Sequence, residues 1–315
     1  MKILVVGGSG FVGANMLEFL LSKKKIEIYS TYFKKKPIIK NKRIKYFKTD
    51  LRILTNCLKI SKSVDHIFMF AGFTFSNYVL KNKDVNKKIS DYILINLNMH
   101  KAAMLNKSKT YFWLSSTTGY SSYVANKKFE EKNFFDYEPP SNYFVPGYLA
   151  RFLERMIKNF SKLYNTKIFT LRPSEIFGEY DDFNSLTSHA LPAYIKKFLD
   201  AKNNVDISVS GNYKFKKNYI YVKELVKICY MLLSKKKKYL ELNISSQEKF
   251  SLEELLSILK EIFKDKNINL VFDRNNISGS RTFSNRKLEK LIKYKVNYSM
   301  KAAVIRTVEW LKYAK

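Results

Sequence analysis

The stretch MKILVVGGSGFVGANMLEFLL, residues 1–21, decides the fold of this chain. It opens with the apolar run Ile3–Val6, which is typical of a strand buried on both faces. Gly7, Gly10 and Gly13 follow at G-x-x-G-x-x-G spacing, and apolar residues then recur at the period of a helix. Such a turn lets a pyrophosphate approach the backbone, and the helix N-terminus offers it free N–H groups. We therefore predict a dinucleotide-binding unit here, with a strand–helix turn that binds no ligand as the alternative.

The composition indicates a globular protein. The 315 residues are 46% hydrophobic and include only six prolines and ten glycines, which excludes fibrous and disordered classes. Cys57 and Cys229 lie in apolar surroundings and predict a reducing compartment without disulfides. The glycine turn interrupts the N-terminal apolar run too early for a signal peptide, and we find no run of membrane-spanning length. We expect a cytoplasmic protein that has no contact with a membrane.

The charge balance is strongly basic, with 58 Lys and Arg against 27 Asp and Glu and a net charge of +31. A basic patch for nucleic acid is one interpretation. The lysines are instead scattered through nearly every loop, in a chain that is also rich in Asn, Ile, Phe and Tyr. This joint bias indicates an AT-rich coding sequence, so we expect no specific nucleic-acid partner. The charge still attracts anionic small molecules.

The second strand bears on the choice of cofactor. It covers Ile26–Tyr29 and continues into Ser30-Thr31-Tyr32-Phe33 and the lysine run Lys34–Lys36. An NAD site usually carries an acidic residue here for the ribose 2′-hydroxyl, and this chain has none. Thr31 and Lys34 would instead receive a 2′-phosphate. The pattern therefore favours NADP, with NAD possible and a solvated lysine run as the alternative.

The later segments predict a Rossmann-type α/β fold, a doubly wound parallel sheet with a second, smaller α/β substrate domain. Further strands are expected at residues 44–47, 65–72, 110–118, 167–171, 219–222 and 240–244, and helices at 92–105 and 148–164. Ser251 and Glu254 predict a capping box that opens another helix. We expect residues 1–173 and 218–244 to form the dinucleotide-binding domain and residues 174–217 and 245–315 the substrate domain. The cleft would lie between the two domains.

Taken in order, several motifs resemble the extended short-chain dehydrogenase/reductase family, the NAD(P)-dependent nucleotide-sugar epimerases, dehydratases and reductases. They are Gly7–Gly13, Asp50-Leu51, Phe70-Ala71-Gly72, Ser115-Ser116 with Tyr120, and Arg172-Pro173 with Ile176-Phe177-Gly178. Residues 175–193, with Ser188-His189 and Pro192, are most similar to the GDP-L-fucose synthases. Those enzymes are NADPH-dependent 3,5-epimerase/4-reductases of a GDP-4-keto-6-deoxy sugar. The resemblance implies an oxidoreductase or epimerase with a nucleotide-sugar substrate, a homodimer and no metal.

The same resemblance implies the site residues. Ser116 would orient the C4 oxygen of the sugar, and His189 with Thr118 would transfer protons in an epimerisation. The residues expected at the cofactor are Gly7, Gly10, Phe11, Val12, Gly13, Thr31, Lys34, Asp50, Leu51, Ala71, Gly72, Ser115 and Arg151. Those expected at the substrate are Asn184, Lys197, Lys217 and Arg281.

The catalytic Tyr and Lys of this family are not in register here. Alignment back from Arg172-Pro173 places the tyrosine at position 146 or 147, which are Pro and Gly, and the lysine at position 150 or 151, which are Ala and Arg. Tyr148 and Arg151 are the nearest substitutes. We therefore expect Tyr148 to provide the proton and Arg151 to provide the cation beside the nicotinamide ribose.

Two alternatives remain open at this point. In the first, Tyr148 packs on the surface and Arg151 pairs with an acidic neighbour such as Glu154. In the second, the chain binds the cofactor and a nucleotide sugar without turning them over.

Overall fold

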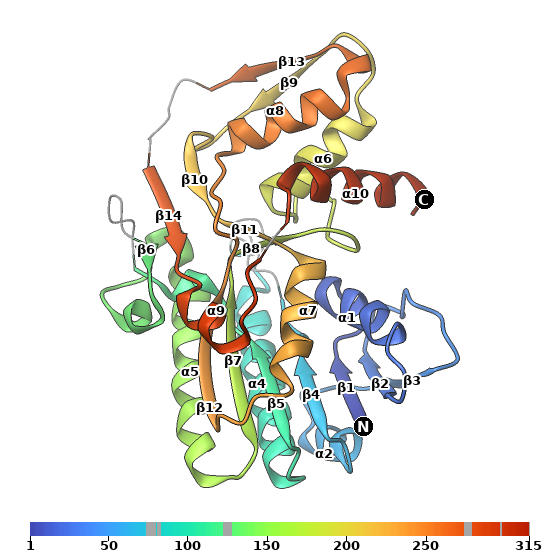
Figure 1. Ribbon diagram of the computed structural model, residues 1–315, viewed down its shortest axis with the longest axis vertical. Helices are drawn as coiled ribbons and strands as arrows, with labels where there is room; N and C mark the ends of the chain where they lie inside the picture. Colours follow the sequence, from blue (N-terminus) through green and yellow to red (C-terminus); the bar gives the residue numbers. More distant parts are fainter. Residues whose placement is uncertain (74–79, 81–82, 122–127, 274–278, 297, 315) are drawn as a thin grey trace.

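The computed structural model describes residues 1–73, 80, 83–121, 128–273, 279–296 and 298–314. Its centre is a parallel sheet of seven strands in the order β12-β7-β5-β4-β1-β2-β3 (Figure 1). The bounds are β1 Lys2–Val6, β2 Glu27–Tyr32, β3 Ile44–Lys48, β4 His66–Met69, β5 Thr110–Leu114, β7 Lys167–Pro173 and β12 Tyr239–Ile244. The chain order reverses next to β1, which carries the glycine turn. The predicted Rossmann-type sheet is thereby confirmed.

Helices cover both faces of this sheet, and the alternation of side chains along β1 shows why its sequence is apolar throughout. Ile3 and Val5 are buried in one apolar cluster with α1 and α7, while Leu4 and Val6 are buried in a second cluster with α2, α4 and α5. The helices are α1 Phe11–Leu21, α2 Leu54–Ser61, α4 Val85–Leu105, α5 Phe144–Leu163 and α7 Val222–Leu232.

The other elements lie mostly above the carboxyl ends of the strands (Figure 1). The additional helices are α6 Ala190–Asp200, α8 Leu252–Ile262, α9 Arg286–Ile292 and α10 Met300–Tyr313. Short strands pair as β9 Val205–Val209 with β13 Ile268–Phe272, and as β8 Glu175–Phe177 with β11 Tyr219–Tyr221. A three-stranded sheet joins β10 Phe215–Lys217, β14 Gly279–Phe283 and β6 Lys128–Phe129. The division into residues 1–173 with 218–244 and residues 174–217 with 245–315 remains our proposal.

The structure tests two local predictions of helix starts, the capping box of α8 and the beginning of α5. The capping box at α8 is confirmed, because Ser251 Oγ accepts from the N–H of Glu254 and the Glu254 carboxylate accepts from the N–H of Ser251. The predicted helix at 148–164 begins earlier, at Phe144. Pro146 falls in its first turn, where the missing N–H would have no helical partner, so the proline does not stop the helix. Among the described residues, no helix combines the length and the apolar character needed to cross a membrane.

His100 of α4 gives the fold a testable dependence on pH. Its side chain is 1% exposed, its ring centroid lies 5.2 Å from that of Tyr111, and neither ring nitrogen has a hydrogen-bond partner in the described part of the chain. Burial lowers the pKa of His100 from 6.5 to about 4. The unfolded chain therefore binds a proton between pH 6.5 and pH 4 that the folded protein excludes, and stability is lost as the pH falls through this range.

We predict that wild-type protein loses roughly 2 kcal/mol of unfolding free energy through His100 between pH 7 and pH 5. The variant His100→Leu should lack this part of the loss. Urea unfolding of both proteins at the two pH values measures the difference. Equal losses in the two proteins would show that His100 does not cause the pH dependence.

Candidate functional site

The glycine turn between β1 and α1 is held by the end of β2. Gly7 has a φ of 87°, and its N–H donates to Oγ1 of Thr31 at 3.0 Å. The N–H of Gly8 donates to the backbone carbonyl of Thr31. A Cβ on Gly13 would stand 2.2 Å from the carbonyl oxygen of Gly7. The backbone of the turn therefore packs too closely for any larger residue at position 13, as the spacing predicts.

The helix that follows this turn presents an anion site. The N-cap of α1 is Gly10, which offers no side chain to the first-turn N–H groups, and the first turn contains no acidic residue. These N–H groups and the positive end of the helix dipole are suited to a pyrophosphate. The close-packed turn and the open helix start together fit a dinucleotide.

Hydroxyl groups lie at the carboxyl end of β5, on the same edge of the sheet. The strand ends at Leu114, and Thr117–Gly119 form a short 3-10 helix, η1. Ser116 Oγ accepts from the N–H of Thr118 at 3.1 Å and lies 2.9 Å from the Thr118 hydroxyl. Ligands of open α/β sheets bind at this edge, so these two hydroxyls are placed to contact one.

A charged cluster approaches the same loop from β8, β10 and β14. Lys217 and Arg281 stand opposite each other in the pairing of β10 with β14, and Nζ of Lys217 lies 3.2 Å from the carboxylate of Glu175. Nη2 of Arg281 donates to the carbonyls of Thr117 and Tyr120 at 2.9 and 3.0 Å. Arg281 is 9% exposed, and its Nε has no partner among the described residues. We call Glu175, Lys217, Arg281 and the nearby His189 the Glu175 cluster.

The charges of this cluster are fixed by their neighbours. Burial raises the pKa of Glu175, but Lys217, His189 and Arg281 outweigh burial and lower it to about 2. Glu175 in turn raises the pKa of Lys217 well above its usual range. The carboxylate and the ammonium are therefore both ionised near neutral pH. One anion thus shares the cluster with two permanent cations, and the excess positive charge suits an anionic ligand.

A buried ion pair supports the loop below this cluster. Arg172 of β7 and Glu154 of α5 are 2% and 1% exposed in their side chains, and Nη2 of Arg172 lies 2.6 Å from the carboxylate. Ser115 donates to the same carboxylate at 2.6 Å. Nη1 of Arg172 donates to the hydroxyl of Tyr120, which donates in turn to Asn243 of β12. The network joins β7, β12 and α5 to both ends of the loop of residues 115–120.

This geometry agrees with the comparisons with known proteins. Residues 3–245 match the profile of the NAD dependent epimerase/dehydratase family. The chain belongs to this family. It is 25% identical over 330 residues to GDP-mannose 3,5-epimerase 1 of Oryza sativa subsp. indica, covering 99% of this chain and 82% of the relative. It is 24% identical to GDP-L-fucose synthase of Dictyostelium discoideum over 52% of either chain.

Solved structures show the same fold. UDP-glucose 4-epimerase of Thermotoga maritima, crystallised with UDP-glucose, superposes with a TM-score of 0.85 at 17% identity, covering 100% of this chain and 99% of that one. Membership of the NAD dependent epimerase/dehydratase family confirms the prediction of an enzyme that uses a nicotinamide dinucleotide. The glycine turn fits such a group, since its backbone is tightly packed and its helix start is uncapped.

Most residues expected at the cofactor lie around the glycine turn. Phe11 and Val12 open α1, and Val12 is buried. Ala71 and Gly72 follow β4, and the backbone N of Ala71 would stand 2.7 Å from a Cβ on Gly7. Ser115 differs, because its hydroxyl is directed into the buried network rather than toward the turn. Its cofactor role stays a prediction.

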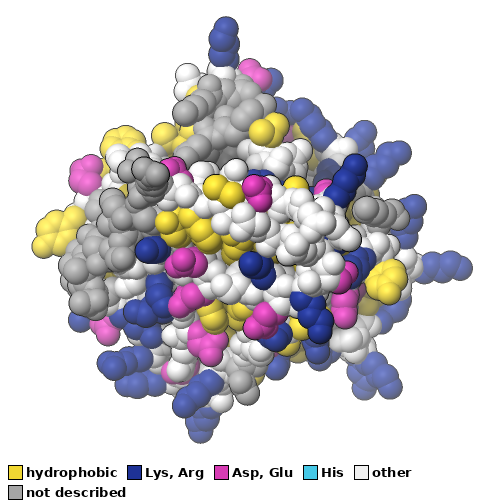
Figure 2. Space-filling view, turned by 90° about the horizontal axis from the view of Figure 1, so that it is seen from above, with side chains coloured by type: hydrophobic (Ala, Val, Ile, Leu, Met, Phe, Trp, Pro, Cys, Tyr) yellow, Lys and Arg dark blue, Asp and Glu magenta, His cyan; other side chains and the backbone are white. Residues whose placement is uncertain are grey.

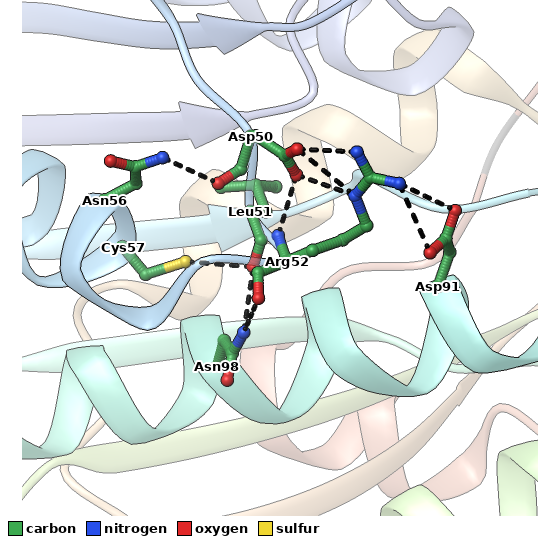
Figure 3. A network of polar contacts seen from close by, with 7 residues as sticks. All are labelled: Asp50, Leu51, Arg52, Asn56, Cys57, Asp91 and Asn98. Carbon is green, nitrogen blue, oxygen red and sulfur yellow. Dashed lines mark hydrogen bonds and ion pairs between the residues drawn. The ribbon is translucent and has the colours of Figure 1, made fainter.

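Asp50 and Leu51 lie in a polar network in the loop after β3 (Figure 3). Both carboxylate oxygens of Asp50 accept from the guanidinium of Arg52, which also reaches Asp91 of α4. This hydrogen bonding to Arg52 lowers the pKa of Asp50. The carbonyl of Leu51 accepts from Sγ of Cys57. The network fixes the loop after β3, and a ligand of Asp50 would share its carboxylate with Arg52.

Lys34 and its neighbours divide between two cavities. One cavity, of about 760 Å³, lies beside β2 and β3 and is lined in part by Tyr32, Lys34 and Lys36. The other, of about 400 Å³, is lined by Lys35 together with residues of α10 and the loop after β8. Tyr32, which lines the larger cavity, directly follows Thr31, the threonine that holds the glycine turn.

Tyr148 and Arg151 are not brought together with the Glu175 cluster. Tyr148 is 36% exposed, its ring centroid lies 4.8 Å from that of exposed Phe144, and a hydrogen bond with Glu138 raises its pKa. Arg151 donates to the carbonyls of Gly119 and Asp136 at 2.7 and 3.0 Å. Tyr148 therefore lies at the surface, as the first alternative states. Arg151 does not pair with Glu154: it binds backbone oxygens, and Glu154 pairs with Arg172.

The residues expected at the substrate are placed differently from one another. His189 is the exposed N-cap residue of α6, close enough to Glu175 to affect its pKa. Lys197 is exposed further along this helix, with Nζ 4.7 Å from the ring centroid of Tyr194. Oδ1 of Asn184 accepts from the N–H of Leu186 within its own loop. Lys217 and Arg281 are joined in the cluster, as described above.

Sequence reasoning assigned no role to Glu175 and considered Glu154 only as a possible partner of Arg151. Glu175 comes two residues after Pro173, which ends β7, a position at the ligand edge of the sheet. Glu154 had a clearer signal, because it interrupts the buried face that α5 forms with Ala150, Leu153 and Ile157. A lone acid on an apolar helix face requires a buried cation as partner, and an arginine on the adjacent strand could have been sought.

We predict that Glu154→Gln lowers the free energy of unfolding by about 3–5 kcal/mol, because it leaves Arg172 charged and buried without its partner. The matched control is Asp200→Asn, which breaks the exposed ion pair with Lys196 on α6 and should cost less than about 0.5 kcal/mol. Urea unfolding at pH 7 measures both. Similar small losses in the two variants would show that the buried pair does not stabilise the fold.

Proposed function

We propose that this protein is an NADP-dependent reductase or epimerase/reductase of a nucleotide-activated 4-keto-deoxy sugar, with GDP as the nucleotide. The observation that carries the proposal is the position of Arg281. Its guanidinium connects β14 to the loop of Ser116 and Thr118 and leaves Nε without a partner in the described residues. A cationic group thus binds the loop that carries two hydroxyls, at the sheet edge that also holds the glycine turn.

The proposed roles follow from this arrangement. When bound, the cofactor supplies or accepts a hydride at C4 of the sugar. Ser116 would orient the C4 oxygen, and Lys217 with Arg281 would neutralise charge on the substrate. His189 and Thr118 would transfer protons if epimerisation accompanies the reduction. The glycine turn and the start of α1 would hold the pyrophosphate of the cofactor.

The choice of GDP is supported by the names of the relatives. GDP-mannose 3,5-epimerase 1 and GDP-L-fucose synthase, which share about a quarter of their residues with the matched segments of this chain, both act on GDP-linked sugars by name. The choice of NADP is supported by Lys34 and Lys36, which line the cavity next to the end of β2. In that position they can contact a 2′-phosphate.

A second candidate function, binding without turnover, is favoured by Gly147. A Cβ at this position would stand 2.6 Å from Cβ of Pro139 and 2.8 Å from the carbonyl oxygen of Thr118. No side chain can therefore be accommodated at one of the two positions where the family places its tyrosine. In this alternative the protein keeps both binding sites but has lost its proton donor.

A nucleic-acid function has less support. On the face drawn in Figure 2, Lys and Arg side chains project outward on most sides, with Asp and Glu side chains between them. The distribution on this face is that of a generally basic surface, which raises the concentration of small anions near the protein.

The test of the proposed function is the loss of NADPH absorbance with a panel of GDP- and dTDP-linked 4-keto-6-deoxy sugars. We expect turnover with at least one GDP-linked sugar, since the site combines a dinucleotide cradle with cations and hydroxyls. Calorimetric titration with the same compounds is the companion measurement. Binding of NADPH and sugar without any loss of absorbance would contradict the reductase and support the second candidate.

For cofactor choice, we predict that the double change Lys34→Gln with Lys36→Gln weakens NADP binding roughly ten-fold, because it removes charge next to the 2′-phosphate. Binding of NAD should change less than two-fold. The matched control is Lys35→Gln, which removes one charge from the other cavity. Equal weakening of both cofactors would mean that the lysines act only through the general field of the protein.

A further inference from the structure

Reduction of a keto group requires a proton donor at the sugar oxygen, and the geometry points to Tyr143. We propose that the phenol of Tyr143 exchanges this proton, a role that rests on the function proposed above. Tyr143 is half-buried and immediately precedes α5, as its N-cap residue. Its ring centroid lies 5.5 Å from Cζ of Arg281, and it thus borders the Glu175 cluster.

The start of α5 brings Tyr143 to this place. Tyr143, Gly147 and Arg151 are spaced by four residues, the spacing that places side chains on one helix face. The position of Gly147 packs on the carbonyl of Thr118, and Nε of Arg151 donates to the carbonyl of Gly119. This face is therefore turned toward η1. Tyr143 precedes this face by one turn, as the last residue of the 3-10 helix Ser141–Tyr143, and it contacts Arg281, which binds the carbonyl of Thr117.

The cluster also suits a group that gives up a proton. The ring centroid of Tyr143 lies 5.5 Å from Cζ of Arg281, and Lys217 stands opposite Arg281 in the neighbouring strand. The two cations are therefore close to the place where negative charge develops when the phenol transfers its proton. They also stabilise negative charge that develops on the sugar oxygen during reduction.

Other phenols near the site have partners or positions that do not suit this role. Tyr120 is fully buried, and its hydroxyl is held between Asn243 and Arg172. Tyr219 is 9% exposed and lies within the β8–β11 pair. Tyr148 lies on the exposed face of α5 beside Phe144. Tyr143 combines partial exposure with contact to a cation of the cluster.

The proposed step transfers a hydride and a proton to the keto group of the sugar. A hydride from the reduced nicotinamide forms a C–H bond at the keto carbon, and the π electron pair of the C=O bond moves to oxygen. That oxygen takes the proton of Tyr143 and becomes a hydroxyl. Water returns a proton to the phenolate. In the oxidative direction the same groups act in reverse.

The test uses the full-length protein with Tyr143→Phe, and Tyr148→Phe as the matched control on the same helix. Loss of the proton donor should lower kcat by about 100-fold or more, with KM changed by less than a few-fold. Tyr148→Phe should retain kcat within two-fold. Tyr143→His, which carries another proton donor, should recover part of the lost rate. Melting temperatures and NADPH affinity verify that each variant is folded.

A second readout does not depend on turnover. Protein labelled with carbon-13 at Cζ of tyrosine is titrated with each sugar of the panel that binds, without cofactor, and the signals are assigned with the two Phe variants. The Tyr143 signal should shift on saturation, and the Tyr148 signal should stay in place.

The outcomes separate the two proposals. A wild-type protein that turns over the sugar, together with a Tyr143→Phe variant of equal kcat or an unshifted Tyr143 signal, would overturn the role of Tyr143 alone. A wild-type protein that turns over no sugar of the panel would overturn the reductase, and the catalytic role of Tyr143 with it.

Discussion

The buried ion pair of Arg172 and Glu154 is the interaction on which the site depends. Taking both groups out of water is costly, and hydrogen bonds with polar neighbours offset part of this cost. Ser115 donates to the carboxylate, and Arg172 donates to the hydroxyl of Tyr120 and to the carbonyl of Glu131. The pair thereby fixes α5 and η2 Glu131–Phe135 against the end of β7. The loop that carries Ser116 and Thr118 takes its position from this support.

From this base, the site is assembled from three directions. The glycine turn of β1 forms the dinucleotide cradle, the loop after β5 contributes hydroxyls, and the strands β10 and β14 contribute cations. Arg281 joins β14 to the loop after β5, because it donates two hydrogen bonds to the carbonyls of Thr117 and Tyr120, about 160 residues away in the sequence. The protein carries an overall charge of +31, and the proposed function assigns a role only to the few cations that packing orders around Glu175.

The sequence predicted what rests on local patterns. A buried apolar run, glycines at fixed spacing and an amphipathic helix allow few structures, so the strand, the glycine turn and the helix followed from residues 1–21. The order of the strands did not, and Tyr219–Tyr221 pairs with β8 rather than joining the main sheet. The start of α5 could not be read in this way, since Pro146-Gly147 suggests a helix boundary although proline is tolerated in the first turn. The earlier start also affects the site, because Tyr143, rather than Tyr148, lies where the helix begins and contacts Arg281. The contacts of Arg281 depend on long-range packing, for which the sequence carries no local signal.

A crystal structure of the protein with NADP⁺ and a GDP-linked sugar tests the account most directly. The account predicts the pyrophosphate of the cofactor at the start of α1 and the sugar between the Ser116–Thr118 loop and the Glu175 cluster. Tyr143 should lie within hydrogen-bond distance of the sugar oxygen at C4, and Tyr148 should remain outside the site. A sugar bound away from Arg281, or placed with Tyr148 rather than Tyr143 at C4, would contradict it.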